Sequence, residues 1–301
     1  MKIPERPAIL APKKSVLSRY KMALALSAVL AVAAVSGTIF YNDSKVAQAN
    51  AVTLAATPVA TPPAAPPKKD DIMDLTASIN VILQKSSLDI SVSVINLNTS
   101  AKYNFGDDAS YVGASEGKLV TASLLLHQVQ QGNIKLSDSL ADKTIQQQLQ
   151  KMIEVSDNDA WTALNDLLGH TNLQAYGAKL GLASYSADNN EISSADTALL
   201  LQKLYKGQLL NTHNTQLLLS YLQVADQKQY IVAGSPEDAR VYHKTGYLDD
   251  RLHDAAIVDD GHTPYILVIF SKTTDGSAYD FSAAETLFGA ITAAVNTQLT
   301  Y

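Results

Sequence analysis

Three short motifs contain residue types suited to acyl-transfer chemistry. The first, Ser115-Glu116-Gly117-Lys118, stands at the start of an expected helix. Residues three apart on a helix share a face, so the Lys118 amine would lie over the Ser115 hydroxyl. A serine becomes a nucleophile beside a base, and burial or a second cation can lower the pKa of a lysine enough for it to act as that base. Helix-start N–H groups also stabilise an oxyanion. The alternative reading of Ser115 is a plain helix cap.

The second motif, Ser156-Asp157-Asn158, lies between two expected helices. Its hydroxyl could relay a proton and its Asn158 amide could hold a substrate carbonyl. These residue types also cap helices and form turns, which is the competing interpretation.

The third motif, Lys244-Thr245-Gly246, falls on an expected strand. Alternation along a strand puts Lys244 and Gly246 on one side, where the glycine would leave room for a substrate backbone at the strand edge. A strand that simply ends in a glycine turn is the alternative.

Composition restricts the classes of protein that remain. The chain has 301 residues, of which 47% are hydrophobic and 17% charged, so wholesale disorder is excluded. It has no cysteine, which excludes disulfides, thiolate zinc sites and a cysteine nucleophile. Residues 71–301 hold 14 basic and 26 acidic residues, a net charge of −12, which disfavours nucleic acid as a partner. The six histidines show no paired ligand spacing, so we expect neither a metal nor another cofactor.

The N-terminal segments predict export and attachment to a membrane. Met22–Tyr41 is a run of 20 uncharged residues, long enough to span a bilayer as a helix, and the basic head 1–21 should keep the N-terminus cytoplasmic. Cleavage of a signal peptide after Ala47-Gln48-Ala49, with release of the domain, is the alternative. Residues 42–70 hold 8 alanines and 5 prolines and read as a semi-rigid linker. We therefore expect a single-pass anchor with its domain, 71–301, outside the cytoplasm.

Within 71–301 the pattern predicts strands at both ends and helices between them. This arrangement favours an α+β fold: an antiparallel sheet with flanking helices and an inserted all-helical lobe. The expected helices are 72–84, 115–131, 144–154, 159–168, 172–180, 194–205 and 281–298, and the expected strands are 89–96, 101–105, 241–244, 255–258 and 265–271.

In order and spacing, the three motifs resemble the signature of the class A β-lactamase and penicillin-binding-protein superfamily. The resemblance covers essentially all of 71–301. Tyr111 fits the aromatic that the family places four residues before its serine, and 253–258 resembles the strand after the Lys-Thr-Gly turn.

That resemblance implies a role for each catalytic residue. Ser115 would be the acylated nucleophile, Lys118 its base or proton relay, and Ser156 the group that passes a proton to the leaving nitrogen. Lys244, with Thr245, would attract the substrate carboxylate.

It also implies how substrate is bound. Asn158 would hold the side-chain amide of the substrate, and Gly246 would give its backbone access to the strand. The N–H groups of Ser115 and Tyr247 would form the oxyanion hole. Arg251 could supply a second carboxylate ligand, although a surface salt bridge is its competing interpretation.

One departure from the family concerns hydrolysis. Class A β-lactamases carry a Glu-x-x-Leu-Asn segment whose glutamate orients the deacylating water. No such segment follows Asn158, where the acids before Ser194 are Asp159, Asp166, Asp188 and Glu191. Glu191 is a substitute base or a solvated loop acid.

The sequence thus predicts an exported serine hydrolase that hydrolyses β-lactams slowly. Its expected partners are a β-lactam or a peptidoglycan stem peptide as substrate and the membrane through Met22–Tyr41, and the domain is expected to be monomeric. A catalytically impaired domain of the same fold that binds cell-wall fragments is the second hypothesis.

Overall fold

A five-stranded antiparallel sheet forms the frame of the computed structural model, which describes residues 69–299, with side chains from Asp74 onward. The strand order is β2-β1-β9-β8-β7, so strands from the two ends of the described chain meet in one sheet. The strands are β1 (Leu88–Asn96), β2 (Lys102–Gly106), β7 (Arg240–Leu248), β8 (Arg251–Asp259) and β9 (Tyr265–Thr273).

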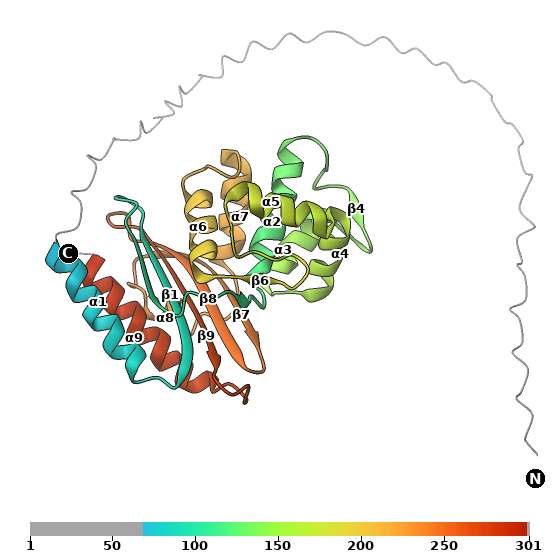
Figure 1. Ribbon diagram of the computed structural model, residues 1–301. Coiled ribbons are helices and arrows are strands. Elements are labelled where there is room, and N and C mark those ends of the chain that lie inside the picture. Colours follow the sequence, from blue (N-terminus) through green and yellow to red (C-terminus); the bar gives the residue numbers. More distant parts are fainter. Residues whose placement is uncertain (1–68, 300–301) are drawn as a thin grey trace, which may run out of the picture. The chain divides into compact units, whose positions relative to one another are not determined.

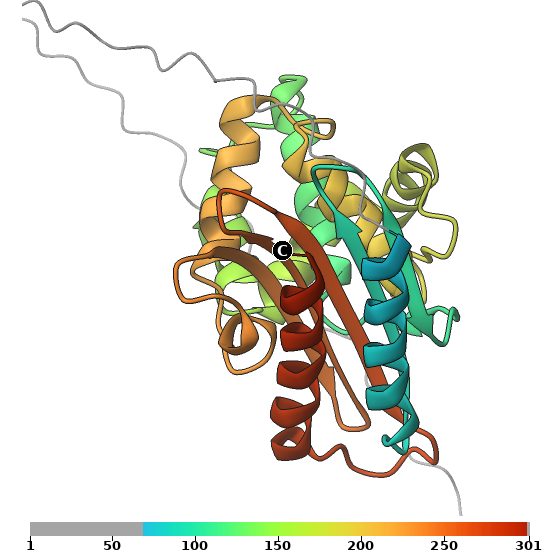
Figure 2. The ribbon, with the colours of Figure 1, turned by 90° about the vertical axis from the view of Figure 1, so that its left-hand side faces the viewer.

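Helices from both ends of the described chain cover one face of this sheet. They are α1 (Lys69–Gln84), α8 (Ile231–Gly234) and α9 (Phe281–Leu299), and α1 and α9 lie side by side across the strands (Figure 2). Ile90, Val92 and Val94 of β1 pack against these helices in one apolar cluster. The intervening hydroxyls of Ser91 and Ser93 point the other way, as strand alternation requires.

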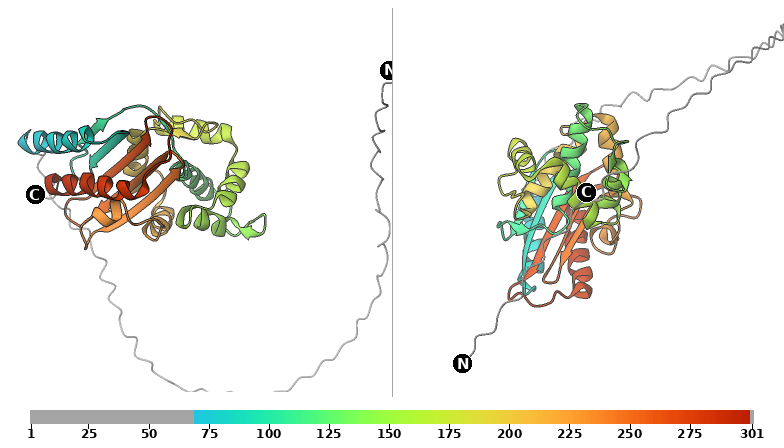
Figure 3. Two further views of the ribbon diagram at one scale, coloured as in Figure 1. Left: turned by 90° about the horizontal axis from the view of Figure 1, so that it is seen from below. Right: turned by 90° about the vertical axis from the view of Figure 1, so that its right-hand side faces the viewer.

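Apart from α8, the helices between β2 and β7 form the helical lobe on the opposite face (Figures 1 and 3). Its helices are α2 (Gly117–Gln130), α3 (Ile145–Glu154), α4 (Asn158–Leu168), α5 (His170–Leu180), α6 (Ser194–Tyr205) and α7 (Thr212–Gln223). Two short hairpin-like pairs accompany them: β3 (Tyr111–Val112) with β6 (Glu191–Ile192), and β4 (Ser139–Leu140) with β5 (Lys143–Thr144).

Helices α6 and α7 pack directly on the sheet, and α2 packs within the lobe against α3, α4, α5 and α7. All residues of α2 from Gly117 to Leu126 are buried, which explains why the sequence of this helix has no polar face. On α6, the hydroxyl of Ser194 lies 2.7 Å from that of Ser91 and 2.8 Å from that of Ser93. The interface between sheet and lobe therefore contains hydrogen-bonded polar groups, and the active-site motifs lie where α2 meets β7.

The α+β arrangement predicted from the sequence is confirmed, with corrections at its details. Helix α2 begins at Gly117 and leaves Ser115 in the preceding turn; α7 and α8 were not predicted; and α1 begins at Lys69, inside the expected linker. The head 1–21, the apolar run Met22–Tyr41 and the linker as far as residue 68 lie outside the described residues. Among residues 69–299, none of the helices is both long and apolar enough to cross a membrane.

Candidate active site

The turn before α2 presents Ser115 next to the amine of Lys118. Ala114 has a positive φ of 47°, and its carbonyl accepts a hydrogen bond from the Asn190 side chain at 2.8 Å, which fixes the turn. The Lys118 Nζ lies 2.7 Å from the Ser115 Oγ. The Lys118 amine therefore lies beside the Ser115 hydroxyl, as the spacing of three residues predicted, although Ser115 precedes the helix.

Lys118 is held by groups from α4 and from the loop before it. Its side chain is buried, and its Nζ donates to Asn158 Oδ1 at 2.8 Å and to Ser156 Oγ at 3.3 Å. The ring of Trp161 lies 4.7 Å from the same ammonium and contributes a cation–π contact. The second predicted motif thus converges on the first.

Ser156 connects the two lysines through its hydroxyl. Its φ is +58°, a left-handed conformation that turns the chain directly before the Asp157 cap of α4. Ser156 Oγ donates to Ser115 Oγ at 2.7 Å and accepts from Lys244 Nζ at 3.0 Å. A hydrogen-bonded path therefore runs from Lys118 and Ser115 through Ser156 to Lys244.

Burial and mutual repulsion set the electrostatics of the two lysines. Desolvation, reinforced by the charge of Lys244, lowers the pKa of Lys118 to about 8. Burial also lowers the pKa of Lys244, the acids around it acting in the opposite direction. A substantial fraction of Lys118 is consequently neutral near pH 8 and able to accept the Ser115 proton.

Two of the predicted substrate-binding residues have surroundings other than those the sequence suggested. The Thr245 hydroxyl donates to Asp254 Oδ1 at 3.1 Å, on the sheet face that carries α8, and is buried there. Gly246 does face Ser115, but a Cβ added to it would lie 2.0 Å from Glu116 Oε2 and 2.6 Å from Ser115 N. The space that this glycine leaves is therefore filled by the protein itself.

Tyr247 and Arg251 lie near the outer end of the β7–β8 hairpin. Tyr247 is exposed, with its ring 5.8 Å from that of Phe281. Arg251 pairs with Asp250 at 2.7 Å, which agrees with the salt-bridge interpretation of this arginine.

The acids considered for deacylation have other positions and partners. Asp159 and Asp166 lie on the exposed side of α4. Asp188 lies 3.1 Å from His170, and Glu191 belongs to β6, where its backbone pairs with Ser186 and Val112.

Sequence reasoning missed Glu116 and Asn190. Glu116 is completely buried at the N-cap of α2, and Asn190 contacts the turn that carries the nucleophile. The sequence held no local signal for the burial of Glu116, which stands between the polar residues Ser115 and Lys118.

The histidines lie in the interior or at the surface without forming a ligand set. His253 Nε2 lies 3.0 Å from the Val112 carbonyl, its ring stacks on Phe270, and burial lowers its pKa to about 4. Within residues 69–299 no group of three metal-ligating side chains gathers.

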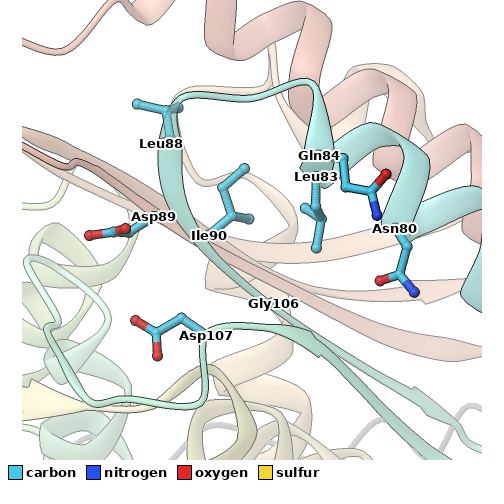
Figure 4. Close-up of a pocket in the computed structure, with 8 residues that line it drawn as sticks. All are labelled: Asn80, Leu83, Gln84, Leu88, Asp89, Ile90, Gly106 and Asp107. Carbon is cyan, nitrogen blue, oxygen red and sulfur yellow. The ribbon is translucent and has the colours of Figure 1, made fainter.

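A surface hollow of about 350 Å³ lies away from this cluster, between α1 and the β1–β2 pair (Figure 4). Asp89 and Asp107 reach it, and Gly106 (φ 76°) closes its floor against the Ile90 carbonyl. Its lining includes no serine, lysine or histidine, so we assign no chemistry to it.

Comparisons with known proteins agree with the geometry. The model of the β-lactamase enzyme family matches residues 74–299. The chain therefore belongs to the β-lactamase enzyme family and is a serine hydrolase of the β-lactamase/DD-peptidase type. A search of curated proteins by sequence gave no match.

Solved structures with the same fold include PBP-A, with a TM-score of 0.70 and 21% identity over 78% of this chain and 97% of that chain. A mutant of PBP-A, solved as an acyl-enzyme complex with penicillin G, has a TM-score of 0.69 and 21% identity over 77% and 98%. A β-lactamase from Sphaerobacter thermophilus has a TM-score of 0.68 and 19% identity over 76% and 98%.

Proposed function

We propose that this domain is acylated at Ser115 by β-lactams or by the D-alanyl ends of cell-wall peptides. One observation carries the proposal: the Ser115 hydroxyl lies 2.7 Å from both Lys118 Nζ and Ser156 Oγ. A nucleophile with a base on one side and a proton relay on the other is the arrangement that acyl transfer requires. The penicillin acyl-enzyme known for a PBP-A mutant supports β-lactams as the substrate class.

In the acylation step, Ser115 Oγ forms a bond to the lactam carbonyl carbon as the carbon–nitrogen bond breaks. The Ser115 proton passes to the neutral amine of Lys118. Ser156 gives its hydroxyl proton to the leaving nitrogen and regains one from the Lys118 ammonium, which donates to it at 3.3 Å, so Lys118 ends neutral and charge and atoms balance. The N–H groups of Ser115 and Tyr247 stabilise the oxyanion. Lys244 attracts the substrate carboxylate, and Asn158, anchored by Lys118, binds the side-chain amide.

Labelling by a fluorescent penicillin tests the nucleophile. We expect one label on the wild-type chain and none on Ser115→Ala, with mass spectrometry placing the adduct on the peptide that contains Ser115. Equal labelling of the two proteins would show that another residue is acylated.

Hydrolysis of the acyl-enzyme should be slow, because the Glu-x-x-Leu-Asn segment is missing after Asn158 and none of the acids Asp159, Asp166, Asp188 and Glu191 is hydrogen-bonded to Ser115, Lys118 or Ser156. General-base assistance is typically worth 10²–10⁴-fold. A chromogenic cephalosporin should therefore give a burst of about one equivalent and then a slow steady state. Fast linear turnover would refute this, and loss of that turnover in Glu191→Gln would identify Glu191 as the base.

For location, the apolar run and the basic head before it support a membrane anchor at Met22–Tyr41, with the domain outside the cytoplasm. Protease added to spheroplasts should remove the domain. A soluble product beginning near Asn50 would instead establish cleavage and secretion.

The second candidate, a domain that binds cell-wall fragments without turnover, is favoured by the missing Glu-x-x-Leu-Asn segment. It predicts that Ser115→Ala binds peptidoglycan as well as the wild type does and that neither is labelled by penicillin. We place it second, because binding has no need of a nucleophile with a proton path.

A further inference from the structure

Glu116 is a buried acid that the acylation mechanism does not use. It occupies the N-cap of α2, but its side chain makes no capping hydrogen bond. Its exposed fraction is 0%, and neither carboxyl oxygen has a hydrogen-bond partner among the described residues. A buried carboxyl without partners is costly, so its presence beside the nucleophile requires an explanation.

The neighbouring strand is shaped to accept this side chain. A Cβ at Gly246 would lie 2.0 Å from Glu116 Oε2 and 3.0 Å from Glu116 Cδ, so any other residue at this position of β7 would displace the carboxyl. The same Cβ would approach Ser115 N to 2.6 Å. Glu116 therefore lies packed between β7 and the turn of the nucleophile, where water reaches it poorly.

Charges of both signs act on Glu116: those of Lys244 and Lys118 favour its carboxylate form, and that of Asp254 opposes it. Burial raises the pKa of Glu116 well above its ordinary value, and the positive charge of Lys244 opposes this most strongly. In return, the Glu116 carboxylate acts to raise the pKa of Lys118 and of Lys244. The titratable groups on the elements packed around it are Lys118 on α2, Lys244 on β7, Asp254 and the buried His253 on β8, and Asp157 at the start of α4.

Resting on the proposed function, we propose that Glu116 is a positioning residue. Its buried side chain, packed between Gly246 and the turn of Ser115, ionises only beside the charged lysines, and as a carboxylate it balances their charge and strengthens the hold of Lys118 on its proton. Without it, two buried ammonium groups would face each other through Ser156. With it, the positive charge that Lys118 gains from the Ser115 proton has a compensating anion close by in a medium of low dielectric constant.

The direct test is titration of Lys118 in the full-length protein without any substrate, by heteronuclear NMR of ¹³Cε-labelled lysine. The wild-type midpoint should fall near the pKa of about 8. In Glu116→Gln, which keeps the shape and cannot ionise, we expect the midpoint to fall by about one pH unit, a tenfold weaker proton affinity. Glu116→Ser, a residue favoured at helix starts, repeats the test if the glutamine variant does not fold.

Glu154→Gln is the matched control, because it removes a carboxylate at the end of α3 and should leave the Lys118 midpoint unchanged. Glu116→Asp keeps an ionisable group and should retain most of the wild-type midpoint. An unchanged midpoint in both neutral Glu116 variants, or an equal shift in Glu154→Gln, would overturn the proposal.

The pH dependence of penicillin labelling separates this proposal from the function on which it rests. If Glu116 acts as proposed, the acid limb of the acylation rate shifts to lower pH together with the NMR midpoint. A rate lowered equally at every pH with no shift would mean a merely structural role and would overturn the proposal. If the midpoint shifts but wild-type Ser115 takes no label at any pH, the acyl-transfer function fails while the control of Lys118 by Glu116 stands.

Discussion

Strand β7 separates two buried polar clusters that differ in how completely their hydrogen bonds are made. On the face toward α8, Asp254 accepts from the Thr245 hydroxyl at 3.1 Å and from Ile231 N at 3.1 Å, and it lies 3.2 Å from His243 Nδ1. The other ring nitrogen of His243 lies 3.3 Å from the Ala225 carbonyl. Every side chain of this cluster has a partner.

On the opposite face, the catalytic cluster holds two buried lysines and an acid whose oxygens have no hydrogen-bond partner among the described residues. The pKa values of both lysines are lowered by burial, and that of Glu116 is raised. A polar network whose hydrogen bonds are all made, such as that around Asp254, stabilises the fold. Buried groups with shifted pKa values, such as Lys118, Lys244 and Glu116, are typical of functional sites. We therefore expect the cluster on the α8 side of β7 to stabilise the fold and the cluster on the opposite side to carry out the reaction.

The largest effect should come from removing the base on the catalytic face. Lys118→Met keeps a similar volume and should slow acylation by 10²–10⁴-fold. The free energy of unfolding should change by less than about 1 kcal/mol, because a desolvated charge is lost together with its hydrogen bonds. Penicillin labelling rates and urea unfolding measure the two quantities. A large loss of stability with little loss of rate would reverse the assignment.

A pH profile should give the next largest effect. The pKa of Lys118 lies below that of an ordinary lysine, and the neutral form is the base, so the rate rises with pH up to about 8 and levels off above it. Between pH 8 and pH 6 the acylation rate should fall about 50-fold, because the neutral fraction of Lys118 falls from about one half to about one hundredth. Stopped-flow acylation in buffers of constant ionic strength measures it. A profile that is flat over this range would exclude Lys118 as the group that titrates.

A substitution in the hydrogen-bonded cluster around Asp254 should lower the free energy of unfolding. Asp254→Ala leaves the Thr245 hydroxyl, the Ile231 N–H and a nitrogen of His243 without their acceptor, so we expect a loss of about 1–3 kcal/mol. The acylation rate of the folded protein should change by less than about fivefold. Denaturant unfolding monitored by circular dichroism, with labelling of the same samples, makes the comparison. If Asp254→Ala slowed acylation as much as Lys118→Met does, the two clusters would act together in the reaction and the comparison would fail.

The sequence predicts the catalytic cluster better than the cluster around Asp254, and the reason is physical. Ser115, Lys118, Ser156 and Lys244 could be assigned because local spacing and the family signature constrain them. Thr245 was placed with the substrate, but strand alternation turns its hydroxyl to Asp254, a partner nine residues away that only pairing of β7 with β8 reveals.

The same limit explains the elements and residues that were missed. The strands and most helices follow from hydrophobic periodicity, which is a local property. The burial of Glu116 depends on Gly246, which lies 130 positions later in the chain. Contacts of this kind arise from tertiary packing and leave no local signal.

The smallest effect concerns the helix cap that directly follows Ser156. Asp157 caps α4 by accepting from Ala160 N at 2.8 Å, and this hydrogen bond lowers the pKa of Asp157 below its ordinary value. Asp157→Ala should cost about 1 kcal/mol. Because the pKa is depressed in the folded state, the contribution of the charged cap is present at neutral pH and is lost as the pH falls through the folded pKa.

Asn211→Ala provides the matched control for that loss, since Asn211 caps α7 by accepting from Asn214 N at 2.9 Å and contacts none of the catalytic side chains described above. Both variants should lose similar stability by urea unfolding at pH 7. Only Asp157→Ala should also slow acylation, by about twofold to fivefold, because the cap holds Ser156 in its left-handed conformation against Ser115. Equal acylation rates in the two variants would mean that Ser156 is positioned by its contacts with Ser115 and the lysines alone, and that the catalytic face of β7 orders its own relay.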